Sequence, residues 1–250
     1  MKNKSSVIIV NSVTMTRVIG TFILPFVSQN MSPAGLIIYI GLLLLTDAVD
    51  GLLARRLKAS TVFGSVLDAT ADKFLGIACL GVLAGKFPIM LCPIVTETII
   101  TIINTRGAVG GSTTDSSTLG KIKTWVLGLS IVLGFATVYI NDIINGINST
   151  TKIGQILITF LEDMATNPDM IMAIIASITV GAGIIVSCDY QIKVKNEIKK
   201  AKAEGFELDK WVLKKGKDLM YALFDEEYYQ KTKNLPLAKK IGVIKNEKNN

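Results

Sequence analysis

Four aspartates stand inside stretches of the chain that are otherwise apolar. Asp47 and Asp50 are three residues apart, and Asp68 and Asp72 are four apart, so each pair lies on one face of a helix. A carboxylate at membrane depth costs about 3 kcal/mol on insertion scales, and such residues usually have a function. Facing carboxylates repel one another unless a cation lies between them. All-oxygen ligation suits Mg²⁺ or Mn²⁺, the usual partners of substrate phosphates.

Small residues and one arginine accompany these acids. Gly51 and Ala54 continue the face of the first pair, and Thr61 and Gly64 precede the second pair. Small side chains let a bulky ligand approach the backbone, and Arg55 can bind a phosphate through two hydrogen bonds. The pattern predicts a metal-dependent site for a ligand that contains phosphate.

The composition excludes several other chemistries. The 250 residues include no histidine, which excludes Ser-His-Asp and Cys-His catalysis and every zinc site that contains histidine. The three cysteines, Cys79, Cys92 and Cys188, are scattered through apolar runs, so we expect small core residues and no disulfide framework.

The same composition indicates a membrane protein. Half of the residues are apolar and only 19% are charged, whereas a soluble domain has about 25% charged residues. We therefore predict an all-α polytopic fold of six transmembrane helices with a polar site that faces the cytoplasm. The expected spans are 12–28, 34–54, 64–86, 88–107, 121–140 and 169–188.

Basic residues in alternate loops predict the orientation. They lie at the N-terminus, in the 55–63 turn and in the 108–123 loop, and such loops stay in the cytoplasm. Both termini are then cytoplasmic, and the second span carries its acids toward the cytoplasmic end. Segment 141–168 is too polar to span, and we expect an amphipathic piece on the outer face.

The formal charge of +7 lies mostly in the last part of the chain. Residues 189–250 hold 15 Lys and 10 Asp or Glu, a net +5. We divide the chain into a membrane domain, 1–188, and a lysine-rich cytosolic tail, 189–250, with helices near 190–203 and 209–224. The tail either attaches to anionic lipid headgroups or is a solvated helical cap. From Lys245 onward we expect disorder, and we expect no nucleic-acid partner.

Three other interpretations of the acidic residues stay open at this point. The four acids can pair with Arg or Lys and hold helices together. They can form the ion pathway of a cation transporter, although we find no internal repeat of the kind that transporters show. An inactive scaffold can also carry a relic site.

The spacing of these residues resembles a known family. Asp47-x-x-Asp50-Gly51-x-x-Ala54-Arg55, followed after eight residues by Gly64-x-x-x-Asp68-x-x-x-Asp72, is similar to the complete signature of the CDP-alcohol phosphatidyltransferases. The resemblance covers residues 8–188 but not the tail. It implies a transferase of phospholipid biosynthesis in the cell membrane. Such an enzyme uses Mg²⁺ or Mn²⁺ to move a phosphatidyl group from CDP-diacylglycerol to an alcohol, and it releases CMP.

The resemblance also implies roles for single residues. Asp47, Asp50, Asp68 and Asp72 hold one or two metal ions, and Asp72 is the general base for the acceptor hydroxyl. The CDP-diacylglycerol contacts are Gly51, Ala54, Arg55, Thr61 and Gly64, together with Asn11 and Thr14 of an Asn-x-x-Thr-x-x-Arg stretch that ends at Arg17. The alternative for Asn11 and Thr14 is helix capping.

The acceptor is implied less directly. Lys121 and Lys123 stand in a Gly-Lys-x-Lys-Thr segment similar to one in the members of the family that use glycerol 3-phosphate, and with Arg106 they are the expected phosphate contacts. The alternative for the two lysines is anchoring at the membrane edge. Inositol phosphate and phosphatidylglycerol, the acceptor in cardiolipin synthesis, remain alternative acceptors. Glu97, inside an apolar span, is expected to hydrogen-bond a neighbouring helix or to orient Arg106. The resemblance also implies a homodimer.

Overall fold

The computed structural model describes residues 4–112, 118–147 and 151–245. The expectation of disorder after Lys245 lies outside these ranges. The helices are α1 Lys4–Val27, α2 Pro33–Arg56, α3 Val62–Ala84, η1 Pro88–Met90, α4 Leu91–Val109, α5 Thr118–Val138, α6 Ile140–Gly146, α7 Lys152–Ala165, α8 Pro168–Ala203, η2 Leu208–Lys210, α9 Gly216–Phe224, α10 Glu226–Thr232 and α11 Leu237–Ile241. Two short strands, β1 Trp211–Leu213 and β2 Gly242–Ile244, pair antiparallel.

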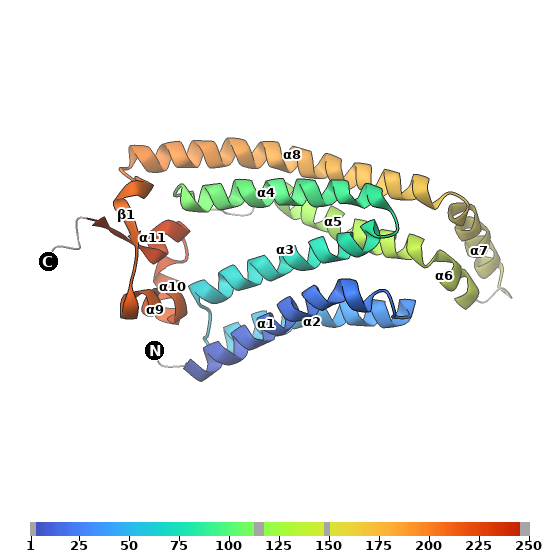
Figure 1. Ribbon diagram of the computed structural model, residues 1–250, viewed down its shortest axis with the longest axis horizontal. Coiled ribbons are helices and arrows are strands. Elements are labelled where there is room, and N and C mark those ends of the chain that lie inside the picture. Colours follow the sequence, from blue (N-terminus) through green and yellow to red (C-terminus); the bar gives the residue numbers. More distant parts are fainter. Residues whose placement is uncertain (1–3, 113–117, 148–150, 246–250) are drawn as a thin grey trace.

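The long helices lie side by side in an elongated bundle (Figure 1). α4 and α5 pack on α8, and α1 packs on α2 and α3. α3 joins the two groups because it also contacts α4 and α5. The described ends of the chain lie at the same end of the bundle as α9–α11, and α6 and α7 lie at the opposite end (Figure 1).

Local capping explains where the helices of the central part begin. The Ser32 hydroxyl accepts from the Gly35 N–H at 3.2 Å ahead of Pro33, the first residue of α2. The Thr61 hydroxyl likewise accepts from the Gly64 N–H at 3.0 Å and starts α3. Each cap satisfies a backbone donor that has no partner within its helix. The turn between α2 and α3 spans only residues 57–61, and both acid-bearing helices pack on α1.

The main apolar core begins one helical turn from the aspartates, at Leu43 and Leu75. It includes Leu24 of α1, Leu36 of α2, Leu80 of α3 and Met172 of α8, all buried. A smaller cluster of Val7, Val10 and Ala59, packed against Phe224 and other residues, lies at the end of the bundle that holds the termini. Packing at both ends holds the polar centre in place.

Five helices of the described part are long and apolar enough to cross a membrane: α1, α2, α4 with η1, α5 and α8. α3, which coincides with the expected span 64–86, is not among them, and it carries Asp68, Asp72 and Lys73. Six spans therefore remain a prediction. α6 and α7, which cover most of the polar segment 141–168, have only 7 and 14 residues.

The tail differs from its prediction. α8 continues without a break through residue 188 to Ala203, so it includes the expected helix 190–203. The expected helix 209–224 is wrong in its first half, because Trp211–Leu213 is a strand and α9 begins at Gly216. Aromatic and β-branched residues favour a strand, and Gly216 adopts a positive φ of 58°, which suits glycine. We call residues 206–245 the C-terminal cap.

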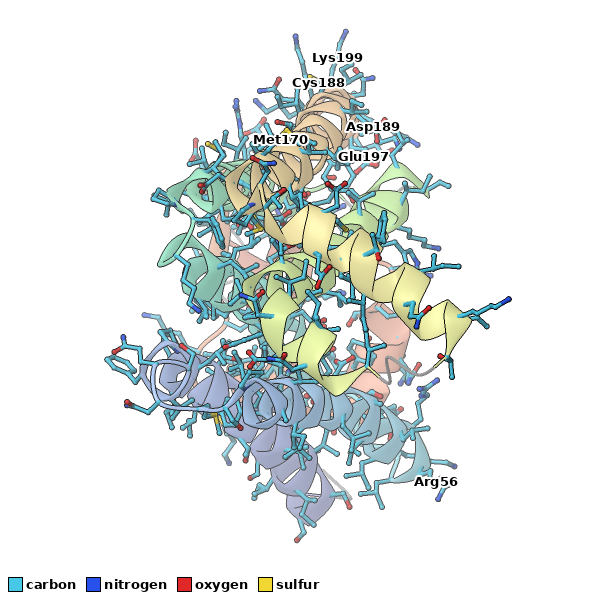
Figure 2. All side chains as sticks on the ribbon, turned by 90° about the vertical axis from the view of Figure 1, so that its right-hand side faces the viewer. Arg56, Met170, Cys188, Asp189, Glu197 and Lys199 are labelled. Carbon is cyan, nitrogen blue, oxygen red and sulfur yellow. The ribbon has the colours of Figure 1, made fainter. Side chains whose placement is uncertain are left out.

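The cysteines also differ in part from the expectation. All three are free and Cys79 is buried, but Cys92 and Cys188 are exposed. Figure 2 shows Cys188 and Lys199 along α8, the outermost helix of that view. A thiol is a small side chain and a weak hydrogen-bond donor, so it needs no polar partner at an exposed position.

Candidate active site

Arg17 of α1 is fully buried among the four aspartates of α2 and α3. Its Nη1 lies 2.5 Å from Oδ1 of Asp47 and 3.3 Å from Oδ1 of Asp72. Its Nη2 forms an ion pair with Asp68 and lies 3.9 Å from Oδ2 of Asp50. The structure thus brings the four acids together. It also realises the interpretation in which they pair with a basic side chain.

Thr14 is one turn before Arg17 on the same helix, and it reaches the most buried of these acids. Its hydroxyl donates a 2.7 Å hydrogen bond to Oδ2 of Asp50, which is only 4% exposed. Asn11 and Thr14 both lie inside α1, which begins at Lys4. The capping interpretation of these two residues is therefore wrong, because the helix starts earlier than expected and neither residue is at its end.

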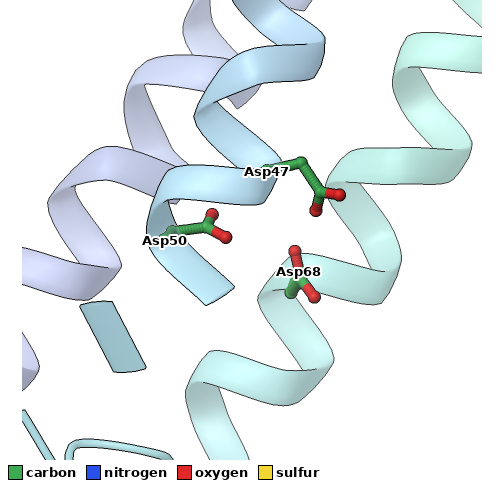
Figure 3. Close-up of side chains that lie close together, drawn as sticks. All are labelled: Asp47, Asp50 and Asp68. Carbon is green, nitrogen blue, oxygen red and sulfur yellow. The ribbon is translucent and has the colours of Figure 1, made fainter. Parts of the chain in front are cut away.

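The carboxylates fit a divalent cation. Asp47, Asp50 and Asp68 offer oxygens that all lie within 4.8 Å of one another, and Figure 3 shows the three side chains around a common space between α2 and α3. Oxygens bound to one Mg²⁺ are up to about 4.2 Å apart, so a small movement would complete the site. Asp72 is outside this group, and 55% of its side chain is exposed. A bound cation and the Arg17 guanidinium would compete for the same oxygens.

A cavity of about 190 Å³ opens beside two of the acids. Asp50 and Asp68 line it. All seven residues predicted to contact CDP-diacylglycerol line it as well: Asn11, Thr14, Gly51, Ala54, Arg55, Thr61 and Gly64. We call it the donor cavity. Three helices and the α2–α3 turn supply these residues, so the bundle gathers a set that is dispersed in the sequence.

Two glycines keep the donor cavity open. A Cβ added at Gly64 would lie 3.0 Å from Oδ1 of Asn11 and 3.1 Å from Oγ1 of Thr61. At Gly51 the nearest atom, Nη2 of Arg55, is 4.0 Å away, so a side chain there would occupy cavity space instead of touching protein. Arg55 Nε donates to the Gly51 carbonyl at 3.1 Å, which holds the guanidinium along the cavity wall.

The predicted acceptor contacts lie elsewhere. Lys123 is buried and forms an ion pair with Glu97 of α4, so Glu97 does bond to a neighbouring helix as expected. Lys121 is exposed. Arg106 lines a separate groove of about 740 Å³ between α4 and α8. None of the three is among the described residues that line the donor cavity.

Two residues that sequence reasoning did not assign belong to this centre. Arg17 ends the Asn-x-x-Thr-x-x-Arg stretch, and that shared stretch was the available signal for its place beside the acids. Tyr229 of the C-terminal cap lines the donor cavity. Its distant position in the tail offers no signal in the sequence.

Comparisons with known proteins agree with this geometry. Residues 7–161 match the family model of the CDP-alcohol phosphatidyltransferases. The CDP-diacylglycerol–glycerol-3-phosphate 3-phosphatidyltransferase of Bacillus subtilis (strain 168) is 38% identical over 95 residues, which cover 35% of this chain and 49% of that protein. An uncharacterized protein of Aquifex aeolicus (strain VF5) is 42% identical over 67 residues, which cover 26% of this chain and 32% of that protein. The matched stretches thus span at most about half the length of these relatives. No solved structure matches.

Proposed function

The chain belongs to the CDP-alcohol phosphatidyltransferase family, and we propose that it transfers a phosphatidyl group from CDP-diacylglycerol to glycerol 3-phosphate. The observation that carries the proposal is the donor cavity, where the seven residues expected to contact CDP-diacylglycerol surround a space bordered by Asp50 and Asp68. The similarity to the CDP-diacylglycerol–glycerol-3-phosphate 3-phosphatidyltransferase of Bacillus subtilis supports glycerol 3-phosphate as the acceptor.

Different residues of the donor cavity contact different parts of CDP-diacylglycerol. Arg55 reaches the donor cavity and binds a phosphate of the nucleotide lipid, while Gly51 and Gly64 let the diphosphate approach the backbone. Asn11 and Thr14 bound the cavity from α1. A fixed arrangement of this kind lowers the barrier because the reacting groups lose little further freedom in the transition state.

A divalent cation, which the family uses, would be held by Asp47, Asp50 and Asp68, with Asp72 at the edge of the group. When bound, it neutralises the diphosphate and stabilises the negative charge that develops on the departing CMP. We propose Mg²⁺ or Mn²⁺, because both take oxygen ligands from carboxylates and phosphates.

Asp72 takes the proton of the acceptor hydroxyl. The hydroxyl oxygen forms a bond to the phosphorus of the phosphatidyl group, and the bond from that phosphorus to the CMP oxygen breaks. Asp72 suits this role because its side chain is the most exposed of the four acids, so an incoming alcohol can reach it. A base within hydrogen-bond reach of the hydroxyl is what this step needs.

The family and the apolar helices make this a multi-pass membrane protein. We propose that the end of the bundle with the termini and the donor cavity faces the cytoplasm, because the basic turns gather there. We also propose a homodimer, as the family resemblance implies.

The test is an assay of the purified chain with CDP-diacylglycerol and Mg²⁺ or Mn²⁺. CMP release is followed with glycerol 3-phosphate, inositol phosphate and phosphatidylglycerol in turn. Release with glycerol 3-phosphate supports the whole proposal, and release with only one of the other two replaces the acceptor and keeps the reaction. No CMP with any alcohol contradicts the transferase.

A further inference from the structure

A second cavity lies against the donor cavity and shares part of its wall. It has a volume of about 560 Å³ and lies between α3, α4 and the C-terminal cap. Ser65 and Tyr229 line both cavities. A molecule in the second cavity would therefore lie beside the donor cavity and its acids.

The second cavity is built for an anion. Three lysines line it, Lys73 from α3 and Lys233 and Lys240 from the cap, and none of its described lining residues is acidic. Neutral polar side chains, among them Asn104 and Thr105 of α4, and apolar side chains such as Phe74 make up the rest of the wall. Ammonium groups attract phosphate, and amides and hydroxyls can hydrogen-bond an alcohol.

Packing holds the cap against the bundle. Phe224 stacks on Phe63 of α3, with ring centroids 5.1 Å apart, and it packs with the cluster of Val7, Val10 and Ala59. α9 also contacts α3, and α11 contacts α4. The cap is thus a fixed wall of the cavity.

Hydrogen bonds within the C-terminal cap set the positions of Lys233 and Lys240. The Tyr228 hydroxyl donates to the carbonyl of Lys240 at 2.8 Å. Nζ of Lys240 donates to the carbonyl of Lys233 at 2.8 Å, which ties together the two segments that carry these lysines. An ammonium group has three donors, so Lys240 keeps two for a ligand.

We propose that the C-terminal cap completes the acceptor site, in which Lys73, Lys233 and Lys240 bind the phosphate of the acceptor alcohol. The inference rests on the proposed function, and it assigns the acceptor phosphate to a cavity that Arg106, Lys121 and Lys123 do not line. The recognised group is a phosphate next to a free hydroxyl. It belongs either to a soluble phosphomonoester such as glycerol 3-phosphate or to the headgroup of a lipid such as phosphatidylglycerol.

The test compares three double variants of the full chain in the CMP-release assay. K233Q/K240Q removes both cap lysines from the cavity. K233R/K240R keeps the charge. K215Q/K217Q removes two charges from the same cap at positions that do not line the cavity, and it is the matched control.

We expect K233Q/K240Q to raise the KM for glycerol 3-phosphate about tenfold, which corresponds to about 1.4 kcal/mol. The KM for CDP-diacylglycerol should stay within about twofold. K215Q/K217Q should match the wild type, and K233R/K240R should recover most of the loss. A KM that is unchanged for both glycerol 3-phosphate and phosphatidylglycerol, or an equal rise in the acceptor and donor KM values, would overturn the inference. If the rise appears with phosphatidylglycerol vesicles and not with glycerol 3-phosphate, the bound phosphate is that of a lipid.

A binding measurement separates this inference from the proposed reaction. Glycerol 3-phosphate should raise the unfolding temperature of the wild type and of K215Q/K217Q but not that of K233Q/K240Q. If this pattern holds while no alcohol gives CMP, the reaction is wrong and the anion site stands. If CMP forms and glycerol 3-phosphate protects K233Q/K240Q as well as the wild type, the site is wrong and the reaction stands.

Discussion

Nη1 of Arg17 lies 2.5 Å from Oδ1 of Asp47, and the arginine side chain is fully buried. This contact joins α1 to α2, and the same guanidinium pairs with Asp68 of α3. The Arg17 guanidinium therefore holds α1, α2 and α3 together around the acids.

Replacing Arg17 should make the protein depend on a divalent cation for stability. In R17Q the four carboxylates lose their counter-charge, and the loss destabilises the protein most at Asp50, because that carboxylate is buried while the other three are about half exposed. Added Mg²⁺ can supply the lost charge. We expect a low unfolding temperature in EDTA and a larger rise with Mg²⁺ in R17Q than in the wild type. An equal Mg²⁺ shift in both proteins would show that Arg17 and the metal do not share oxygens.

Removing the Thr14 hydroxyl should destabilise the protein. T14V leaves the buried Asp50 carboxylate without a hydrogen bond of 2.7 Å, and an unsatisfied buried acceptor costs about 1–3 kcal/mol. The control is T16V, because the Thr16 hydroxyl bonds to the Ser12 carbonyl at an exposed position. Denaturant unfolding of both variants measures the difference. Equal stability of T14V and T16V would contradict the importance of the contact with Asp50.

A methyl group at Gly64 should weaken donor binding. Its Cβ would lie 3.0 Å from Asn11 Oδ1, so the donor cavity must narrow or its wall must shift. We expect G64A to raise the KM for CDP-diacylglycerol about tenfold with a smaller effect on the acceptor KM. The matched control is G41A on α2, where an added Cβ meets nothing within 4 Å. A donor KM that is the same in G64A and G41A would contradict the assignment of this cavity.

The pair between Glu97 and Lys123 should act in stability rather than in acceptor binding. E97A leaves a buried ammonium without its partner, at a cost of about 3–5 kcal/mol, whereas the double variant E97L/K123L should recover much of that loss. Unfolding of the single and double variants measures the coupling. A K123L variant of normal stability with a raised acceptor KM would support the contact between Lys123 and acceptor phosphate that the sequence predicts.

Local spacing explains what the sequence could predict about this site. The intervals within each aspartate pair place both acids on one helical face, and the short turn after α2 makes the two faces meet. The same motif contains Gly51, Ala54, Arg55 and Gly64, four residues that line the donor cavity, and the Asn-x-x-Thr-x-x-Arg stretch adds Asn11 and Thr14. These residues have fixed spacings within α1 and within the α2–α3 segment, so a sequence motif can identify them even though the fold brings the two segments together.

Contacts between distant segments are what the sequence could not predict. Arg17 is 51 residues from Asp68, and its place among the acids depends on how α1 packs on α3. Lys123 stands at the expected helix start, but the packing of α5 turns it inward to Glu97. The cap packs on the bundle through Phe224 and lines both cavities with Tyr229, and no periodic pattern in the tail indicates that docking.

The most direct test of the central claim is a time course of CMP and lipid product from CDP-diacylglycerol, glycerol 3-phosphate and Mg²⁺ with the purified chain. A phosphatidyl transfer predicts one CMP for each new phosphatidyl lipid, with both products absent when the acceptor is omitted and lost in D68N. CMP that forms equally well without any alcohol, or no CMP at all, would contradict it.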